Sequence, residues 1–479
     1  MEGWTIGLLA VALVVVYYTH LVYKWKNPKY KNGVLPPGSM GWPLLGETLQ
    51  FIMPGKSLDL HPFVKKRMQK YGPIFKTSLF GRPIIVSTDN EVNKYILKRE
   101  GALVELWYLD SFSKVFALEG DTRVNAIGRV HSYLRSITLN HFGVDSLKEK
   151  LLPKVEDMIQ MNLKKWSAQD LPVDVKHVVS VMVFNFAANQ IFGYDGENSK
   201  QKLSENYTRI LNSFISLPIN LPGTTFSKCM KDRKQMLKIL KEELMVRLSS
   251  PASRRGDFLD QAIADMETNK FLTVDFIPQL MFGILFASFE TISTTLTLTF
   301  KFLSENPEVV EALRAEHEAI IKKRENPDSG LTWEEYRSMT FTHMVVKETL
   351  RIANNLPGLF RKALKDFEIK GYTVPAGWTL MLVTAAVQLN PETFKDPVKF
   401  NPWRWQDLDQ VTISKNFMPF GGGIRQCAGA EYSKLVLATF LHNLVTKYRF
   451  TKFKGGEICR MPLISFGDGI HIKFTPIDN

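Results

Sequence analysis

A glycine-rich segment around one cysteine carries the strongest chemical signal in this 479-residue chain. It reads Phe420-Gly-Gly-Gly-Ile-Arg-Gln-Cys-Ala-Gly429, with Arg425 two residues before Cys427. Glycines permit a tight turn that brings backbone N–H groups close to sulfur. Residues 430–448 are expected to form a helix, and the partial positive charge of its N-terminus lowers the pKa of a thiol placed just before it. Cys427 is therefore a candidate thiolate, either a metal ligand or a nucleophile; the alternative is a buried cysteine beside a glycine turn.

A second set of residues suggests a buried ionic network. Glu348 and Arg351 lie three residues apart on a predicted helix over residues 341–353, so their side chains share a face and can pair. Their neighbours are mostly apolar, which favours a buried pair over a solvated surface pair. Buried ions need further partners, and Arg404 in the segment Phe-Asn-Pro-Trp-Arg-Trp is a candidate third member.

An isolated acid marks a long apolar segment. Residues 276–303 are nearly uncharged and predict a helix that is buried along most of its length. Between Met281 and Phe300 the only ionisable side chain is Glu290, so it faces either a charged partner or a functional cavity. Thr291 adds a hydroxyl beside it. The alternative is a glutamate on an exposed stripe, with the threonine as filler.

Several basic residues are candidates for binding an anionic cofactor. His131 and Arg135 are four residues apart and share one helical face. Arg361 and Arg425 are the other candidates, because guanidinium groups form charge-assisted pairs with carboxylates. Taken singly, each of these residues is more often found on a solvated surface.

The N-terminus predicts a membrane anchor. Residues 4–23 carry no charge if His20 is neutral, and as a helix they would span about 30 Å, the thickness of a bilayer core. Lysines follow at positions 24, 26, 29 and 31, whereas Glu2 is the only charged side chain before the segment. This asymmetry places the rest of the chain on the cytoplasmic side. A cleaved signal peptide is the alternative, but the basic start and small-residue cleavage site that it requires are not evident.

The remaining chain is expected to form one large domain, mainly α with small peripheral β-sheets. The predicted organisation is an anchor over residues 4–23, a basic and proline-rich hinge over 24–44, and the domain over 45–479. Proline and glycine make residues 35–46 stiff, although a flexible tether is the alternative. Strand-like runs occupy residues 74–87, 367–373 and 469–475.

Composition narrows the cellular setting. The three cysteines, at positions 229, 427 and 459, are too few and scattered for a disulfide framework, which favours a reducing compartment. The net charge of +13 arises from 61 basic and 48 acidic residues that are dispersed along the chain. Dispersed basic charge suits an acidic partner protein or an anionic membrane better than nucleic acid.

The pattern Phe-x-x-Gly-x-Arg-x-Cys-x-Gly resembles the haem-binding loop of the cytochrome P-450 family. The order of Glu-x-x-Arg, a Pro-x-Arg segment and the cysteine loop is also similar to that family, and the resemblance covers essentially the whole chain. The segments 36–47, 220–224 and 417–423 look like the plant branch that acts on sterols, brassinosteroids and triterpenoids, and are especially similar to its triterpenoid oxidases.

The resemblance implies a role for each candidate residue. Cys427 would be the axial ligand of the haem iron within a loop that includes Phe420 and Gly429. Arg425, Arg135, Arg361 and His131 would bind the haem propionates, and the network of Glu348, Arg351 and Arg404 would hold the loop. Glu290 and Thr291 would deliver protons at the oxygen site, although Ser288 and Ile292 replace the usual glycine and last hydroxyl of that motif. The candidate pocket wall, each member of which could instead be plain core, consists of Trp107, Met281, Leu285, Leu356, Leu359 and Ile464.

The function that follows from the resemblance is a membrane-anchored haem-thiolate monooxygenase with the cytochrome P-450 fold. Its expected cofactor is haem b, its co-substrate O2, and its electron source NADPH through NADPH–cytochrome P-450 reductase. The expected location is the endoplasmic reticulum membrane, with the domain on the cytosolic face, and the expected substrate is a triterpenoid or sterol-like lipid. Two alternatives stay open: a haem-thiolate isomerase or dehydratase of an oxygenated lipid, and a non-enzymatic haem protein that carries a ligand.

Overall fold

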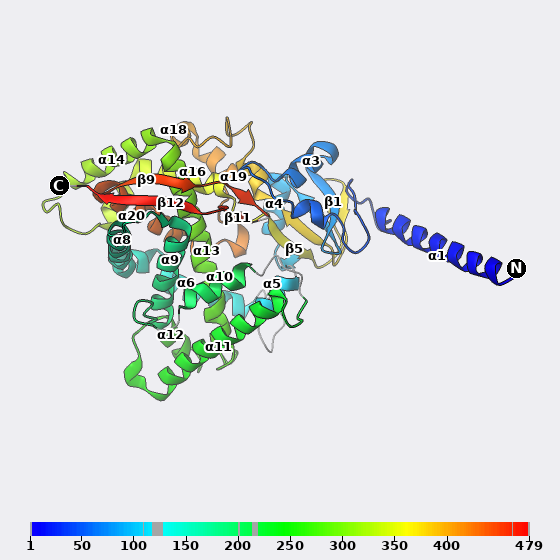
Figure 1. Cartoon of the computed structure of the whole chain (residues 1–479), viewed down its shortest axis with the longest axis horizontal. Coiled ribbons are helices and arrows are strands. Elements are labelled where there is room, and N and C mark those ends of the chain that lie inside the picture. Colours follow the sequence, from blue (N-terminus) through cyan, green and yellow to red (C-terminus); the bar gives the residue numbers. More distant parts are fainter. Residues whose placement is uncertain are drawn as a thin grey trace.

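The computed structural model describes residues 2–108, 110–116, 128–199, 202–212, 219–461 and 463–477. Most of the described chain forms one helical body, from which helix α1 (Glu2–Lys26) projects (Figure 1). The 20 residues Gly7–Lys26 of this helix form a segment that is long and apolar enough to cross a membrane. The most apolar part of this segment is not buried in the protein. An apolar helix that packs against nothing is unstable in water but suited to lipid, so α1 suggests a membrane anchor.

Helix α13 (Phe276–Glu305) runs through the centre of the body and organises the core. It packs on α9 (Val175–Phe192), α16 (Thr340–Ala353) and α20 (Ala430–Lys447). Twenty of its residues are buried, which agrees with the absence of charge in its sequence. The same length and hydropathy would fit a membrane span, but burial identifies α13 as a core helix.

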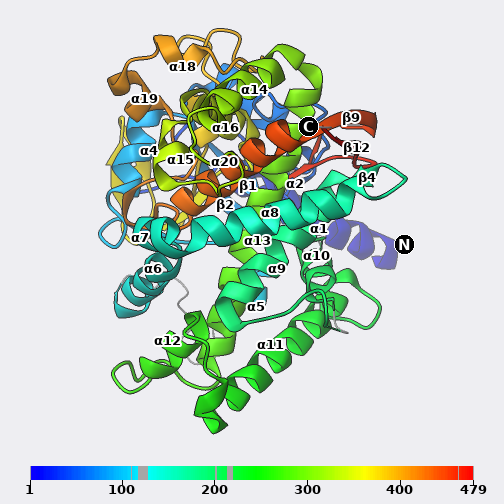
Figure 2. The same cartoon turned by 90° about the vertical axis from the view of Figure 1, so that its left-hand side faces the viewer.

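The remaining helices surround this centre, and α11 and α12 lie on the side of the molecule opposite α18 and α19 (Figure 2). Their bounds are α2 (Thr48–Phe51), α3 (Pro62–Tyr71), α4 (Asn90–Leu97), α5 (Asp110–Phe116), α6 (Arg129–Phe142), α7 (Val144–Ser146), α8 (Leu152–Ser167), α10 (Leu203–Asn212), α11 (Thr225–Ser249), α12 (Phe258–Ala264), α14 (Pro307–Ile321), α15 (Trp333–Ser338), α17 (Thr384–Gln388), α18 (Arg404–Asp407) and α19 (Gln410–Asn416).

The strands form small sheets at the edges of the helical body. The largest has the order β1-β2-β8-β5-β3, in which only β2 and β8 are parallel. A second sheet has the order β4-β12-β9, and two hairpins pair β6 with β7 and β10 with β11. The bounds are β1 (Ile74–Leu79), β2 (Arg82–Ser87), β3 (Val104–Leu106), β4 (Val173–Asp174), β5 (Leu359–Ala363), β6 (Phe367–Ile369), β7 (Tyr372–Val374), β8 (Thr379–Leu382), β9 (Tyr448–Gly455), β10 (Cys459–Arg460), β11 (Ile464–Ser465) and β12 (Ile470–Pro476).

These elements confirm the predicted fold class. The helices predicted over 276–303, 341–353 and 430–448 appear within two residues of their expected ends. Two of the strand-like runs, 74–87 and 367–373, are each a hairpin of two strands rather than one strand, because a turn interrupts them.

Candidate functional site

The cysteine loop is a tight turn that glycine makes possible. Gly421 and Gly423 have φ angles of 70° and 68°, a region that side chains rarely adopt. A Cβ atom at Gly423 would lie 2.2 Å from the carbonyl oxygen of Leu97, at the end of α4. The Cys427 N–H donates to the carbonyl of Phe420 at 3.0 Å and closes the loop immediately before α20. The backbone therefore presents the cysteine from a fixed position between α4 and α20.

Cys427 is exposed and the loop residues around it are exposed or half-buried, although protein atoms surround the thiol. Burial of its surroundings raises the pKa of the thiol, and the Gly429 N–H and the charge of Arg135 oppose this effect. The pKa of the thiol is therefore raised where a lowered pKa was expected, although the Gly429 N–H at the N-terminus of α20 acts in the expected direction. Arg425 is engaged elsewhere, and the nearby cation is Arg135, whose Nη1 donates to the carbonyl of Gln426 at 2.7 Å.

Glu100 joins two of the predicted cofactor-binding arginines. Its Oε2 lies 2.5 Å from Nε of Arg361, on β5, and its Oε1 lies 3.4 Å from Nε of Arg425, in the cysteine loop. The Glu100 and Arg361 side chains are 1% and 4% exposed, so both charges are withdrawn from water. Sequence reasoning missed Glu100, because no local pattern connects it to arginines that are far away in the chain.

The fourth predicted residue of this group, His131, lies half-buried on α6 with Arg135. Burial and the charges of Arg425 and Arg135 lower the pKa of His131, so its ring is neutral at pH 7. The electrostatic effects of the arginines on His131, and of Arg361 on Arg425, place these residues in one cluster. The cluster contains three guanidinium groups and one carboxylate.

This donor set fits haem. Three arginines against one glutamate leave an excess of positive charge that suits a cofactor with two carboxylates. A single exposed thiol suits a metal whose other ligands come from a macrocycle. Among the residues that the structure describes, no group of three or more His, Cys, Asp or Glu side chains could hold a bare metal ion.

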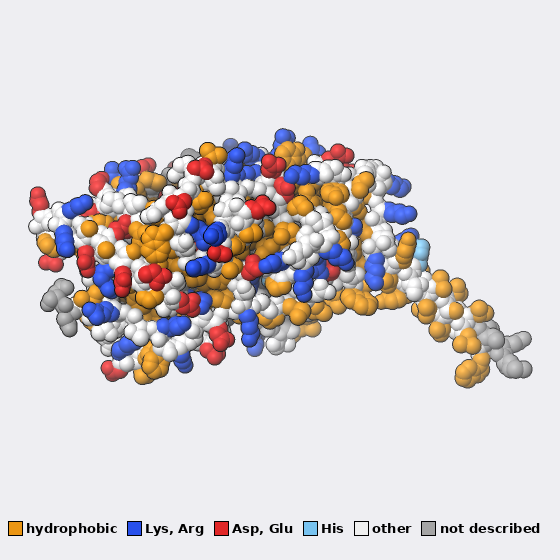
Figure 3. All heavy atoms as spheres, turned by 90° about the horizontal axis from the view of Figure 1, so that it is seen from above, with side chains coloured by type: hydrophobic (Ala, Val, Ile, Leu, Met, Phe, Trp, Pro, Cys, Tyr) orange, Lys and Arg blue, Asp and Glu red, His pale blue; other side chains and the backbone are white. Residues whose placement is uncertain are grey.

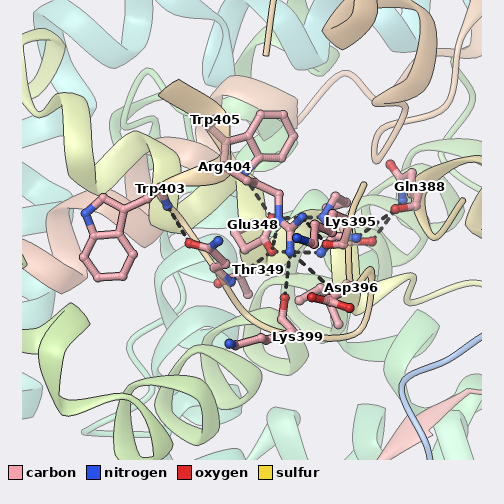
Figure 4. Close-up of polar contacts among 12 residues, drawn as sticks. Glu348, Thr349, Gln388, Lys395, Asp396, Lys399, Trp403, Arg404 and Trp405 are labelled. Atoms are coloured by element: carbon pink, nitrogen blue, oxygen red, sulfur yellow. Dashed lines mark hydrogen bonds and ion pairs between the residues drawn. The ribbon is translucent and has the colours of Figure 1, made fainter. Parts of the chain in front are cut away.

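The predicted network of Glu348, Arg351 and Arg404 is present and buried (Figure 4). Arg351 donates to both oxygens of Glu348 at 2.9 and 2.8 Å, and Nε of Arg404 donates to Oε1 at 2.9 Å. Nε1 of Trp405 donates to Oε2 at 3.0 Å, a partner that the sequence did not reveal. The four contacts satisfy a carboxylate that is fully withdrawn from solvent.

Gln388 connects this network to the cysteine loop. Its backbone carbonyl accepts from Nη1 of Arg351 at 2.9 Å, and its side-chain Oε1 accepts from the N–H of Met418 at 3.0 Å. Met418 lies in the segment that leads into the loop, two residues before Phe420. The network therefore reaches the cysteine loop through one buried amide.

Glu290 and Thr291 have different surroundings on α13. The Glu290 carboxylate forms an ion pair with Nζ of Lys176 on α9 at 2.8 Å and accepts from Oγ1 of Thr294 at 3.1 Å. Nζ of Lys176 also donates to Oγ of Ser293 at 2.8 Å. Of the two alternatives for Glu290, a charged partner is the one observed. Burial lowers the pKa of Lys176, and Glu290 opposes that shift.

Thr291, in contrast, is exposed although it belongs to the core helix. Its hydroxyl donates to the carbonyl of Ala287, also exposed, at 3.3 Å. Nδ2 of Asn355 donates to the carbonyl of Thr291 at 3.3 Å and to Oγ1 of Thr295 at 3.1 Å. Asn355 thereby fixes the turn after α16 against this part of α13, and sequence reasoning missed it.

The candidate pocket residues separate into two groups. Met281 and Leu285 are fully buried and Ile464 is 6% exposed, all three within the main core. Packed neighbours enclose these three side chains, and their place in the substrate wall stays a prediction. Leu356 is 53% exposed, and Trp107 and Leu359 are partly buried.

Leu359 links this wall to the cysteine loop. A Cβ atom at Gly421 would lie 3.5 Å from its Cδ1 atom. The Trp107 ring contacts Phe360, the next residue of β5, with ring centroids 5.9 Å apart. Trp107, Leu356 and Leu359 therefore remain the wall candidates near the loop.

Comparisons with known proteins agree with this geometry. The chain is 54% identical over 473 residues to cucurbitadienol 11-hydroxylase of Siraitia grosvenorii, covering 99% of each chain. It is 51% identical over 472 residues to beta-amyrin 16-alpha-hydroxylase of Maesa lanceolata, covering 98% of this chain and 99% of the relative. The retinoic acid-bound cyanobacterial CYP120A1 superposes with a TM-score of 0.82 at 27% identity, covering 93% of this chain and 100% of that one.

The family model for cytochrome P-450 matches residues 36–466. This family uses haem iron and O2, with electrons from NADPH that arrive through a reductase. The fold, the cysteine loop and the sequence matches together show that this chain belongs to the cytochrome P-450 family of monooxygenases.

Proposed function

We propose that this cytochrome P-450 inserts one oxygen atom from O2 into a C–H bond of a triterpenoid or sterol-like polycyclic lipid. The observation that carries the substrate class is the identity above 50%, over nearly the full length, to two plant hydroxylases named for cucurbitadienol and beta-amyrin. Cholesterol 22-monohydroxylase of Paris polyphylla is 35% identical, which supports a rigid polycyclic substrate more broadly. An apolar wall discriminates weakly between related shapes, so a hydroxylated product can bind again. Repeated oxidation of one carbon to a ketone is therefore part of the proposal.

In this proposal Cys427 ligates the haem iron, and Arg425, Arg135 and Arg361 bind the propionates beside His131. Phe420 and Gly429 form the loop, and the Gly429 N–H and the Arg135 charge favour the thiolate form of Cys427. When bound, haem supplies the activation of O2 that lets one oxygen atom enter an unactivated C–H bond.

The proposed proton-handling residues are Thr291 and Glu290. The Thr291 hydroxyl can meet a water or substrate, because this residue is exposed. In this proposal the Glu290 carboxylate exchanges protons with its ion-pair partner Lys176 on α9. Trp107, Leu356 and Leu359 contact the substrate and exclude water from the reacting carbon.

The proposed partner is NADPH–cytochrome P-450 reductase, and the proposed location is the endoplasmic reticulum membrane. We take residues 4–23 as the anchor, 24–44 as the hinge and 45–479 as the cytosolic monooxygenase domain. The exposed apolar helix α1 and the lysines that follow it support this orientation. A body held at the bilayer surface can take a lipid substrate directly from the membrane.

The test is a reconstitution with reductase and a panel of triterpenes, sterols, diterpenes, fatty acids and phenylpropanoids, with products identified by mass spectrometry. We expect oxygenated products from the triterpenes or sterols and consumption of NADPH in proportion to product. Turnover confined to fatty acids or phenolics would contradict the substrate class. Product formation without NADPH would instead favour an isomerase or dehydratase.

A further inference from the structure

A basic pocket lies outside the haem site, where β10 meets the start of α3. Its volume is about 310 Å³, and its charged lining is Lys56, Asp59, Lys65, Lys66 and Arg460. Two backbone hydrogen bonds, Gly55 N–H to Arg460 O at 2.9 Å and Arg460 N–H to Gly55 O at 2.8 Å, hold the two segments together. The pocket is therefore built by elements that are far apart in the chain.

Arg460 is a buried cation without an acidic partner. It is 4% exposed, and no carboxylate among the described residues forms an ion pair with its guanidinium. Nη1 and Nη2 donate to the carbonyls of Asn354 and Ala353 at 3.0 and 3.2 Å, whereas Nε makes no hydrogen bond. Burial lowers the pKa of Arg460 to about 10, so it stays charged at pH 7. A buried charge that neutral carbonyls alone contact is stabilised further by an anion.

The rim adds positive charge that is only partly neutralised. Asp59 pairs with Lys65 at 2.6 Å and compensates one of the three lysines. Lys56 and Lys66 are exposed, and neither forms an ion pair with another residue in the described part of the chain. Nδ1 of His61, at the base, accepts from the N–H of Phe63 at 3.2 Å, and burial lowers the pKa of this histidine, so it adds no charge. The pocket therefore keeps an excess of three positive charges, from Arg460, Lys56 and Lys66.

The pocket lies at the membrane end of the body. Helix α3 and strand β1 are at the end nearest α1 (Figure 1), and basic and hydrophobic side chains are interspersed there (Figure 3). The residues just before the pocket expose large apolar side chains: Leu45, Leu49 and Met53 are 55%, 62% and 63% exposed. Apolar side chains beside basic ones are typical of a surface that rests in the interface of an anionic bilayer.

We propose that this pocket binds the phosphate group of an anionic membrane lipid. Arg460 supplies the buried guanidinium, Lys56 and Lys66 close over the phosphate, and the neighbouring apolar side chains contact the acyl region. The proposal depends on membrane attachment through α1 and is independent of the oxidation chemistry at Cys427. It would give the body a second, headgroup-specific attachment that fixes its tilt on the membrane.

The experiment measures lipid binding to the full-length, haem-loaded protein in mild detergent by native mass spectrometry. The probes are dioleoyl phosphatidic acid and dioleoyl phosphatidylcholine. We expect one phosphatidic acid to bind at least tenfold more tightly than phosphatidylcholine. The double variant Lys56→Gln/Lys66→Gln should bind phosphatidic acid at least fivefold more weakly than the wild type. Its affinity for phosphatidylcholine should be unchanged. The Arg460→Gln variant should bind phosphatidic acid still more weakly. Its haem spectrum serves as the control that the variant is folded.

Two matched variants locate the effect. Lys70→Gln, on the same helix but outside the pocket, should change binding less than twofold. Lys24→Gln/Lys26→Gln removes basic residues at the end of α1, the other plausible lipid contact. Loss of selectivity in the α1 variant but not in the pocket variant would overturn the proposal, as would equal binding of the two lipids by the wild type. Complete competition by 10 mM inorganic phosphate would overturn the lipid assignment in favour of a soluble anion.

Discussion

Nζ of Lys176 lies 2.8 Å from Oε2 of Glu290 and holds that carboxylate on the α9 side of helix α13. The next residue, Thr291, is exposed on another face, because successive residues of a helix point about 100° apart. The acid and the alcohol that the sequence presents as one motif therefore occupy different environments. Thr291 is exposed, whereas the Glu290 side chain is 28% exposed and is held by its ion pair with Lys176.

This separation predicts that Thr291→Ala keeps the haem spectrum and substrate binding but diverts electrons to peroxide. The reason is that in the proposed role the Thr291 hydroxyl delivers protons and does not ligate the metal. Product formed per NADPH consumed should fall several-fold, with hydrogen peroxide accounting for the difference. Thr291→Ser keeps the hydroxyl and is expected to restore most of the coupling. An unchanged ratio in the alanine variant would mean that Thr291 only packs.

The position of Glu100 between Arg361 and Arg425 predicts a role in holding haem. Glu100→Gln removes the charge that orients both guanidinium groups but keeps the shape of the side chain. We expect haem transfer from the variant to apomyoglobin to be about tenfold faster, equivalent to a barrier to haem loss that is lower by about 1.4 kcal/mol.

Glu105→Gln is the matched control for this measurement. Glu105 lies nearby on β3 and pairs only loosely, at 3.9 Å, with the half-exposed Lys362 of β5. Its haem transfer rate should equal that of the wild type, since exposed pairs contribute little. Equal rates in the Glu100 and Glu105 variants would show that Glu100 does not position the arginines.

The sequence predicted those features that depend on local chemistry. The cysteine loop, α13 and α20 follow from glycine placement and from runs of apolar residues, and Glu348 with Arg351 follows from helical spacing. Pairs such as Lys176 with Glu290, or Glu100 with Arg361, join residues that only the tertiary fold brings together. The complete burial of Met281 and Leu285 could not be predicted for the same reason: an apolar helix does not reveal which of its faces meets a cavity and which meets another helix.

The buried network predicts a large loss of stability for Glu348→Gln. This change leaves Arg351 and Arg404 without their shared carboxylate, and breaking a buried ion pair costs about 3–5 kcal/mol. Trp405→Phe removes only one of the hydrogen bonds to Glu348 and should cost about 1 kcal/mol. Thermal unfolding of the haem-loaded proteins measures both. Similar midpoints for the two variants would contradict the central place of Glu348.

A pair of buried histidines predicts acid sensitivity. Nδ1 of His317 on α14 lies 3.0 Å from Nδ1 of His442 on α20, and burial lowers the pKa of each to about 3. The charge of His442 also lowers the pKa of His317, and Arg324 and Lys447 lower that of His442. Between about pH 6.5 and pH 3 the unfolded chain binds protons that the folded chain does not, so stability falls as pH falls through this window.

His442→Gln removes one of the two titrating groups. Its free energy of unfolding should depend on pH less steeply than that of the wild type, by about 1.4 kcal/mol per pH unit between pH 6 and pH 4. Unfolding measured at several pH values in this range gives the slopes. Parallel slopes for variant and wild type would show that the pair does not account for the acid sensitivity.

The most direct test of the haem-thiolate assignment is the absorption spectrum of the reduced protein with carbon monoxide, in the wild type and in Cys427→Ser. Thiolate ligation gives a strongly red-shifted Soret band. We predict this band in the wild type and its complete loss in the variant, with Cys459→Ser as a control that keeps it. Retention of the red-shifted band in Cys427→Ser would contradict the assignment of Cys427 as the axial ligand.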